Sequence, residues 1–290
     1  MPNVRLRRVR DVSTFRRLAV AAWRPSRDPS IHGSLELDAT AALADLEAVH
    51  ARTGQKVTLT HLVGRAVAVA LRERPQVSMM IRRQRFYARR DVDIFFQVAL
   101  AREAADARAY DLSGIVIRNA DRKSTAAIAR EFGARVEAVR ADRDPELAGL
   151  RRALARVPPL LLRPLYTVLD VLQYSFNLRL PGLPRDPFGA AMITNVGMFG
   201  VRWAYPPLFP PAHCPIVILV GAVTLRPWVV HTDAGPRVEP RPVLPLHATF
   251  DHRVLDGVEA ARFGARIEAL LEAPGQLDVA DGAGAEIATP

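Results

Sequence analysis

The order of helical and extended patterns along the chain constrains its fold more than any other feature. Apolar and polar residues alternate over residues 31–38, which is typical of a half-buried strand, whereas residues 58–71 are apolar on nearly all sides, as in a buried helix. Further strand patterns lie at residues 92–100, 115–117, 190–194, 216–223 and 244–250, and further helical patterns at 40–50, 124–139 and 257–271. These patterns do not alternate as regular β-α-β units. The order favours an α+β fold in which helices flank a largely antiparallel or mixed sheet.

The chain gives no sign of division into separate domains. Its 290 residues contain no internal repeat, low-complexity block or alanine- and proline-rich linker, so we predict one domain over residues 1–290. Residues 228–231 and 237–240 flank Asp233-Ala234-Gly235, which predicts a hairpin.

Residues 153–180 form an unusually apolar segment. A core helix or a helix at an oligomer contact would explain it. The alternative is an exposed apolar surface that binds a membrane or a long acyl chain.

The net charge of +10 does not by itself indicate a nucleic-acid partner. Only Lys56 and Lys123 are lysines, so arginine supplies nearly all of the positive charge, and the basic residues do not interleave with aromatic residues in a stacking pattern. We expect no nucleic acid to bind. A positive surface would still suit an anionic substrate or carrier.

Cysteine and histidine usage excludes some kinds of site. The single cysteine, Cys214, excludes an internal disulfide and a cysteine-based zinc cluster, and buried packing is its simplest role. No pair of histidines has metal-ligand spacing, so we expect no metal. The sequence has no secretory signal pattern and no uninterrupted apolar stretch of about 20 residues, which predicts a cytoplasmic protein.

The strongest chemical signal is the run FDHRVLDG at residues 250–257. His252 follows a predicted strand and precedes a predicted helix, where a rigid scaffold often presents reacting groups. Histidine is also the side chain best suited to accept a proton near neutral pH. By spacing alone, a structural role for His252 and an N-cap role for Asp256 fit equally well. Gly257 would permit a backbone angle that other residues resist.

Three motifs in order resemble one known family over nearly the whole chain. DHRVLDGVEAARF at 251–263 is similar to the active-site signature of the 2-oxo acid dehydrogenase acyltransferases, MITNVGMFG at 192–200 resembles their strand-turn segment, and IRNADRKS at 117–124 resembles the stretch leading into a helix of that domain. The resemblance implies the chloramphenicol-acetyltransferase-like fold.

The resemblance also implies a mechanism. His252 would act as general base on the thiol of coenzyme A or of a dihydrolipoyl-type acceptor, and the thiolate would attack the thioester of the other partner. Thr194, at the position of the family's serine, would donate its hydroxyl to the oxyanion. Asp256 would fix the loop through an ion pair with an arginine near the N-terminus, for which Arg16 and Arg17 are the candidates. Asn195 and Gly257 would be architectural.

Three features set this chain apart from the pattern that the resemblance implies, and one is the 153–180 segment, which is longer and more apolar than that pattern and which we interpret as an insertion. The sequence starts directly with the catalytic region, and neither lysine resembles a lipoylated hairpin tip. Any lipoyl group would therefore come from another polypeptide, or another acyl carrier would serve in trans. Residues 101–112 stand where the family usually has a short turn, which lies near the substrate channel in relatives. The resemblance therefore does not identify the acyl donor.

We therefore expect a coenzyme A-dependent acyltransferase whose site lies between the subunits of a homotrimer. The tail after Pro274 is polar and glycine-rich, which predicts a trimer that does not assemble further. The alternatives are a catalytically silent trimeric scaffold and a membrane-associated protein of the same fold.

Overall fold

The computed structural model describes residues 28–101, 110–141 and 157–277. The strands are β1 (Ser30–Asp38), β2 (Met80–Arg82), β3 (Arg85–Tyr87), β4 (Ile94–Ala101), β5 (Tyr110–Ile117), β6 (Ala191–Asn195), β7 (Ile216–Val220), β8 (Thr224–Thr232) and β9 (Gly235–Asp251). The α-helices are α2 (Thr40–Thr53), α3 (Leu59–Glu73), α4 (Thr125–Arg140), α6 (Pro159–Asp170) and α7 (Gly257–Glu272), and a π-helical turn, Val171–Ser175, follows α6.

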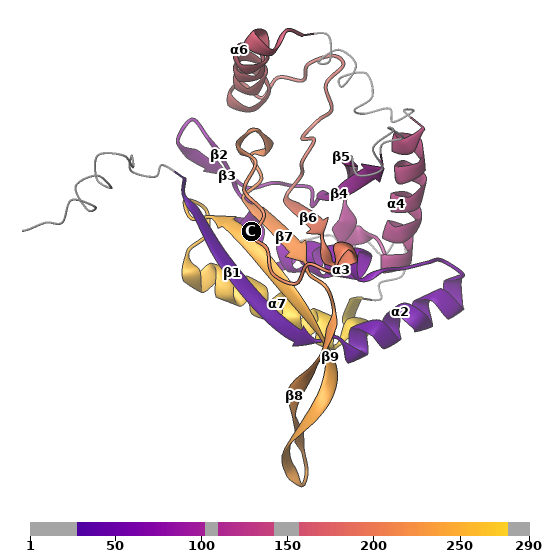
Figure 1. Cartoon of the computed structure of the whole chain (residues 1–290). Coiled ribbons are helices and arrows are strands. Elements are labelled where there is room, and N and C mark those ends of the chain that lie inside the picture. The colour runs from indigo at the N-terminus through magenta and orange to yellow at the C-terminus, as the bar shows by residue number, and fades with distance from the viewer. Residues whose placement is uncertain (1–27, 102–109, 142–156, 278–290) are drawn as a thin grey trace, which may run out of the picture.

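Seven strands form one mixed sheet. Six of them follow the order β1-β9-β7-β6-β4-β5, and β8 pairs with β9 outside this path. The pairs β4–β6 and β6–β7 are parallel, and the other pairs are antiparallel. The predicted α+β class with a mixed sheet flanked by helices is confirmed (Figure 1). A small separate ladder, β2–β3, was not predicted.

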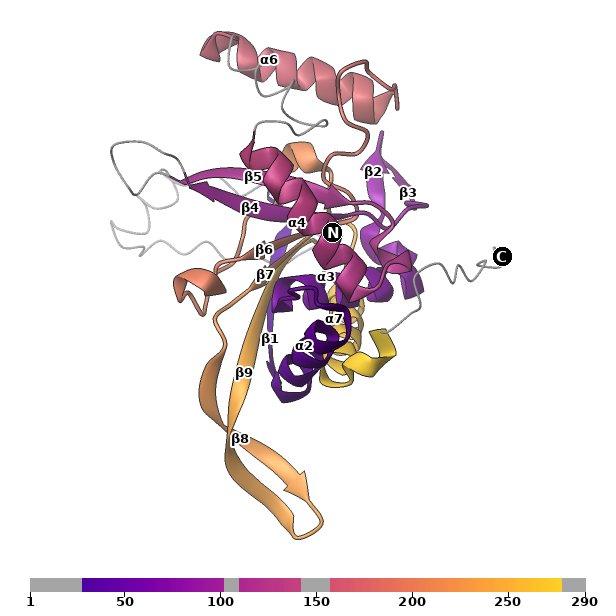
Figure 2. The same ribbon diagram turned by 90° about the vertical axis from the view of Figure 1, so that its right-hand side faces the viewer.

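Strand β9 is one continuous element of 17 residues, whereas the sequence pattern predicted two strands. Its second half pairs with β7 on one side and β1 on the other, and its first half pairs only with β8. The β8–β9 hairpin therefore projects from the body of the sheet in both views (Figures 1 and 2). The predicted turn is confirmed at Asp233 and Ala234.

Helices α2, α3 and α7 lie on one face of the sheet (Figure 2). Helix α3 is buried from His61 to Leu71, as the apolar pattern predicted. A Cβ atom on Gly64 would lie 2.3 Å from Cζ of Phe96, so this glycine lets α3 approach the sheet closely. The fully buried Arg65 donates from Nη1 to the backbone carbonyls of Ala120 and Asp121. These contacts fix the turn between β5 and α4.

Different segments pack on the opposite face of the sheet, which we call the open face. The segment from residue 196 to residue 212 and the helix α6 lie on this side, and α6 stands away from the other helices (Figure 1). Much of α6 is solvent-exposed, with Leu160 at 90% and Leu161 at 56% exposure. A fully buried core helix therefore does not describe α6, which lies within the 153–180 segment. In the described parts of the chain, no helix is both long and apolar enough to cross a bilayer.

Candidate functional site

A tight turn joins β9 to α7 and carries the FDHRVLDG run. Asp251 is buried at the end of β9, and its carboxylate accepts hydrogen bonds from the Arg253 side chain, with Nη2 to Oδ2 at 2.6 Å. The same carboxylate accepts the Arg253 backbone N–H at 2.9 Å. This pairing raises the pKa of the Arg253 guanidinium. Leu255 is fully buried, so the turn is held at both ends, and His252 and Arg253 between them are exposed to solvent.

His252 is exposed on this turn and its ring is oriented by one hydrogen bond. Nδ1 lies 2.9 Å from the backbone oxygen of Leu255. Since a carbonyl can only accept, Nδ1 carries the proton in the neutral ring and Nε2 keeps a lone pair. Nε2 has no partner within the described parts of the chain. The histidine backbone is held as well, because its N–H donates to the oxygen of Pro29 at 2.8 Å. The imidazole thus has the tautomer and the exposure that a general base needs.

Asp256 caps helix α7. Its Oδ1 accepts the backbone N–H of Glu259 at 2.8 Å, which satisfies one of the free donors of the first turn. The predicted arginine partners, Arg16 and Arg17, lie outside the described residues. Gly257 starts the helix without a positive φ, and an added Cβ would meet no atom within 4 Å. The expected special backbone angle at Gly257 is therefore wrong.

Thr194 lies on the open face of β6. Its neighbours Ile193 and Asn195 point to the helical face, where Asn195 Nδ2 donates to Thr60 Oγ1 at 2.7 Å. Side chains alternate along a strand, so Thr194 and Met192 share the open face. Thr194 is 9% exposed, and its hydroxyl has no hydrogen-bond partner among the described residues. Asn195 Oδ1 also accepts the Met198 N–H at 3.3 Å, so the role of Asn195 is structural.

One chain does not bring His252 and Thr194 together. Thr194 pairs with Leu219 on β7, and Leu219 pairs with His247 on β9. His252 lies five residues beyond His247, which corresponds to about 16 Å along the strand and about 10 Å across two strand spacings. The hydroxyl of one chain therefore cannot reach a carbonyl that is attacked beside His252 of the same chain.

The IRNADRKS motif builds a turn. Arg118 Nη1 binds Asp93 Oδ2 at 2.9 Å, and the N–H of Asn119, a residue with φ of 48°, donates to Oδ1 of the same carboxylate at 2.8 Å. Ser124 caps α4 by accepting the Ala127 N–H at 3.2 Å. These residues shape the connection between β5 and α4, and their role is structural.

A polar network that the sequence did not reveal lies between β1 and β9 on the open face. The Ser34 hydroxyl lies 2.8 Å from Nδ1 of the fully buried His247 and 2.7 Å from the Tyr205 hydroxyl. His247 Nε2 donates to the oxygen of Arg202 at 2.7 Å, which ties the 196–212 segment to the sheet. No signal in the sequence pairs Ser34 with a histidine 213 positions away.

Neither a reactive thiol nor a metal-binding cluster is found among the described residues. Cys214 is buried and donates to the oxygen of Ile216 at 3.3 Å, and burial raises the pKa of its thiol to about 11, so it is an unreactive packing residue. The described residues include no cluster of three or more histidine, cysteine, aspartate or glutamate side chains able to hold a metal ion.

Comparison with protein-family models gives one match. The model of the 2-oxoacid dehydrogenases acyltransferase (catalytic domain) matches residues 6–146 and 188–279. The two stretches leave out residues 147–187, and the apolar 153–180 segment lies within this interval.

Curated relatives are longer than this chain. The dihydrolipoyllysine-residue acetyltransferase component of the acetoin cleaving system of Bacillus subtilis is 27% identical over 228 residues, which are 78% of this chain and 44% of the relative. The corresponding component of the pyruvate dehydrogenase complex of Zymomonas mobilis is 35% identical over 86 residues, 30% of this chain and 18% of the relative. The match therefore spans less than half the length of either relative.

Solved structures share the fold. A probable dihydrolipoamide acetyltransferase from Listeria monocytogenes superposes with a TM-score of 0.63 at 21% identity, covering 94% of this chain and 98% of that one. The dihydrolipoamide acetyltransferase of Azotobacter vinelandii gives a TM-score of 0.60 at 21% identity and covers 96% and 99% of the two chains. The work on the latter concerns a serine, a histidine and an asparagine in its catalytic mechanism.

Proposed function

Because the chain belongs to the 2-oxoacid dehydrogenase acyltransferase (catalytic domain) family, we propose that it transfers an acyl group between coenzyme A and a second thiol such as dihydrolipoamide. The observation that carries this proposal is the orientation of the exposed His252, whose Nδ1 bonds to the Leu255 backbone oxygen and whose Nε2 keeps a lone pair. A thiol is only slightly ionised at neutral pH, so a base held in this way accelerates its attack.

The reaction needs one proton shuttle and one oxyanion donor. Nε2 of His252 takes the proton of the attacking S–H, and the sulfur forms a bond to the carbonyl carbon of the thioester. The carbon–sulfur bond of the leaving thiol then breaks, and that sulfur receives the proton from the imidazolium. The Thr194 hydroxyl, which has no other partner among the described residues, stabilises the negative oxygen between these steps.

We infer that the two groups come from different subunits. The register of the sheet separates Thr194 from His252 of the same chain by far more than a hydrogen bond. A cyclic oligomer solves this problem, since one surface of each copy meets a different surface of the next copy, so that Thr194 of one chain can lie beside His252 of its neighbour. A homotrimer is the assembly that the family resemblance implies, with a mass three times the 31.9 kDa of one chain. Light scattering tests this, and a much larger mass would refute the lone trimer.

A lipoyl group is one candidate for the second thiol. The relatives named above are dihydrolipoyllysine-residue acetyltransferase components. The described chain supplies the acyltransferase fold, and we propose that a lipoyl or other acyl-carrier protein docks in trans.

The test is thioester exchange between labelled coenzyme A and a panel of acyl-coenzyme A donors, with and without dihydrolipoamide. His252→Ala is compared with wild type and with His231→Ala, which removes an exposed histidine on the β8–β9 hairpin. Loss of a general base lowers the rate by about 10²- to 10⁴-fold, whereas the control keeps the wild-type rate. If both variants retain the wild-type rate, His252 is not the base. Absence of exchange by wild type with every donor and acceptor favours the silent scaffold.

A further inference from the structure

A largely apolar cavity of about 550 Å³ lies on the open face of the sheet. Its floor consists of side chains from the central strands, including Phe95, Met192 and Val217. Its roof includes Leu169 of α6 and Tyr174 of the π-helical turn. The volume falls within the range of about 300 to 1,000 Å³ that is typical of small-molecule sites.

Aromatic rings and prolines make most of the wall. The ring centroids of Phe95 and Phe188 lie 5.2 Å apart, and those of Phe188 and Phe209 lie 5.6 Å apart. Gln97 and Ser113 come from the adjoining strands β4 and β5, and the roof contributes Gln173 and Asp170, whose carboxylate is engaged by His213. Such a wall favours an uncharged apolar group over a phosphate or a carboxylate.

The cavity adjoins the proposed oxyanion donor. Met192 lines the floor and lies two residues before Thr194 on the same face of β6, which is a step of about 7 Å along a strand. A thioester whose carbonyl oxygen meets the Thr194 hydroxyl would thus have the cavity within reach of its acyl substituent.

The roof belongs to the segment that the family model does not match. Residues 147–187 separate the two matched stretches, and α6 and the π-helical turn lie within them. This chain therefore adds apolar surface above a part of the sheet that belongs to the matched fold.

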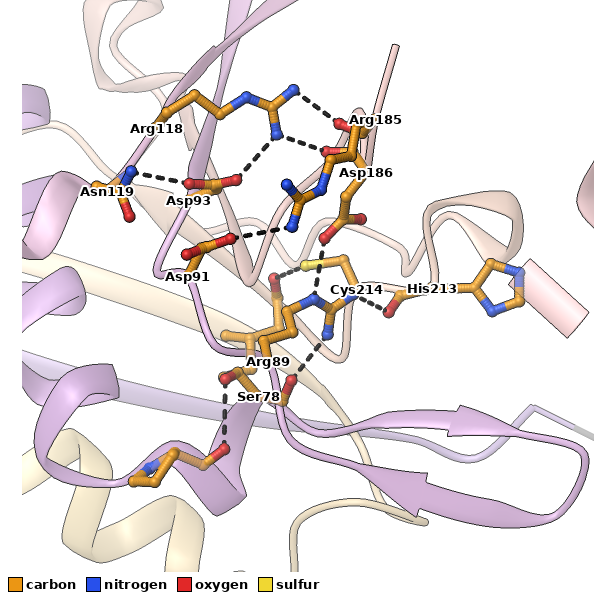
Figure 3. Close-up of polar contacts among 12 residues, drawn as sticks. Ser78, Arg89, Asp91, Asp93, Arg118, Asn119, Arg185, Asp186, His213 and Cys214 are labelled. Carbon is orange, nitrogen blue, oxygen red and sulfur yellow. Dashed lines mark hydrogen bonds and ion pairs between the residues drawn. The ribbon is translucent and has the colours of Figure 1, made fainter. Parts of the chain in front are cut away.

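Hydrogen bonds and one ring stack hold the roof in position. Asp170, at the end of α6, accepts a hydrogen bond from His213 Nε2 at 2.6 Å, and the His213 ring stacks on Tyr174 with centroids 4.1 Å apart. At the far end of the segment, Arg89 donates from Nε to Asp186 Oδ2 at 3.2 Å and from Nη2 to the oxygen of His213 at 2.9 Å (Figure 3).

Arg118 completes this anchorage. Its guanidinium joins the Asp93 carboxylate to the backbone oxygens of Arg185 and Asp186, at 2.7 Å and 3.1 Å (Figure 3). These contacts hold the roof at one end of the floor strands, where β4 and β7 begin and β5 ends.

We propose that this cavity binds the hydrocarbon tail of a straight-chain aliphatic acyl group, so that the enzyme prefers donors much longer than acetyl. The proposal rests on the acyltransfer function above and specifies its substrate class. Each methylene buried in such a cavity strengthens binding about fourfold, and two of them already produce a preference of more than tenfold.

The test compares kcat/KM for acetyl- and octanoyl-coenzyme A in three variants. Leu169→Arg places a charge in the roof, and Ser113→Trp fills the cavity from the sheet side. Leu160→Arg is the matched control, because Leu160 lies on the same helix, is 90% exposed and does not line the cavity. Melting temperatures of all variants establish that they fold.

Wild type and Leu160→Arg are expected to favour octanoyl over acetyl by at least about tenfold, and the two cavity variants to lose at least about tenfold on octanoyl while keeping acetyl transfer. Equal rates for both donors in wild type, or an equal loss on both donors in the cavity variants, would overturn the proposal. So would a fall in the mass of the oligomer in Leu169→Arg with unchanged donor preference, because the cavity would then be a subunit contact.

A direct binding measurement separates this proposal from the function on which it rests. If wild type transfers neither acyl group, the acyltransfer function fails, and calorimetric titration with octanoyl- and acetyl-coenzyme A still tests the cavity. Tighter binding of octanoyl-coenzyme A that Leu169→Arg abolishes would support the cavity, and equal affinity for the two would reject it.

Discussion

The buried His61 at the start of α3 makes the stability of the protein sensitive to mild acid. The side chain is 6% exposed, and its Nδ1 accepts the backbone N–H of Thr58 at 3.2 Å in a capping box. Its ring packs edge-on against Phe132 with centroids 4.7 Å apart. Burial disfavours the imidazolium and lowers the pKa of His61 from 6.5 to about 4.

The sign and size of the effect follow from linkage. The unfolded chain takes up the proton first, because its pKa is the higher one. The stabilisation by neutral His61 is therefore complete above pH 6.5 and is lost as the pH falls towards 4. The whole pKa shift corresponds to about 3 kcal/mol in the free energy of unfolding. About 2 kcal/mol of this stabilisation is lost when the pH falls to 5.

Urea unfolding at pH 7.5 and pH 5.0, at one protein concentration, measures this loss. His61→Gln keeps an acceptor for the cap but does not titrate, so its free energy of unfolding should fall by about 2 kcal/mol less than that of wild type between the two pH values. His231→Gln, which changes an exposed histidine, should behave as wild type. Equal pH slopes in wild type and His61→Gln would refute the reasoning.

Substitutions at three further positions test the site and its surroundings. Thr194→Val should lower kcat by about 10²- to 10³-fold with little change in melting temperature, while Thr194→Ser should retain most activity in the exchange assay. Asp256→Ala removes the cap on the Glu259 N–H and should reduce the free energy of unfolding by about 1 kcal/mol in urea, whereas Asp256→Asn should cost much less; equal losses would mean that the cap is not the cause. Gly114→Ala would place a Cβ 1.9 Å from Cζ of Phe95, and the displaced ring should lower stability by about 1 to 3 kcal/mol and weaken octanoyl transfer; an unchanged melting temperature would contradict this.

Local sequence patterns predicted the elements that depend on near neighbours. The strand pattern before Asp251 and the cap at Asp256 lie within a few residues of each other, so the strand-turn-helix around His252 could be inferred from sequence alone. The burial of α3 followed from its apolar composition in the same way. The continuity of β9 could not be inferred, because Arg241 and Pro242 interrupt the apolar alternation between its two halves.

Features that depend on distant residues escaped prediction. The separation of Thr194 from His252 is a consequence of strand register, which no local pattern encodes. The cavity needs Phe95 from β4 and Phe209 from a loop more than one hundred residues later. Its roof depends on how residues 157–187 fold back over the sheet, and the sequence indicated only that this segment is apolar.

The projecting β8–β9 hairpin also bears on self-association of the chain in solution. A long exposed edge strand offers unpaired backbone groups to any other chain and invites aggregation. Here Pro227 on β8 faces Pro240 on β9, and Pro236 and Pro242 face His231 and Leu225. Proline has no N–H to donate, so at these positions the ribbon cannot template a further strand. The β8–β9 hairpin can therefore project from the sheet while its prolines discourage the hairpins of different molecules from pairing into fibres.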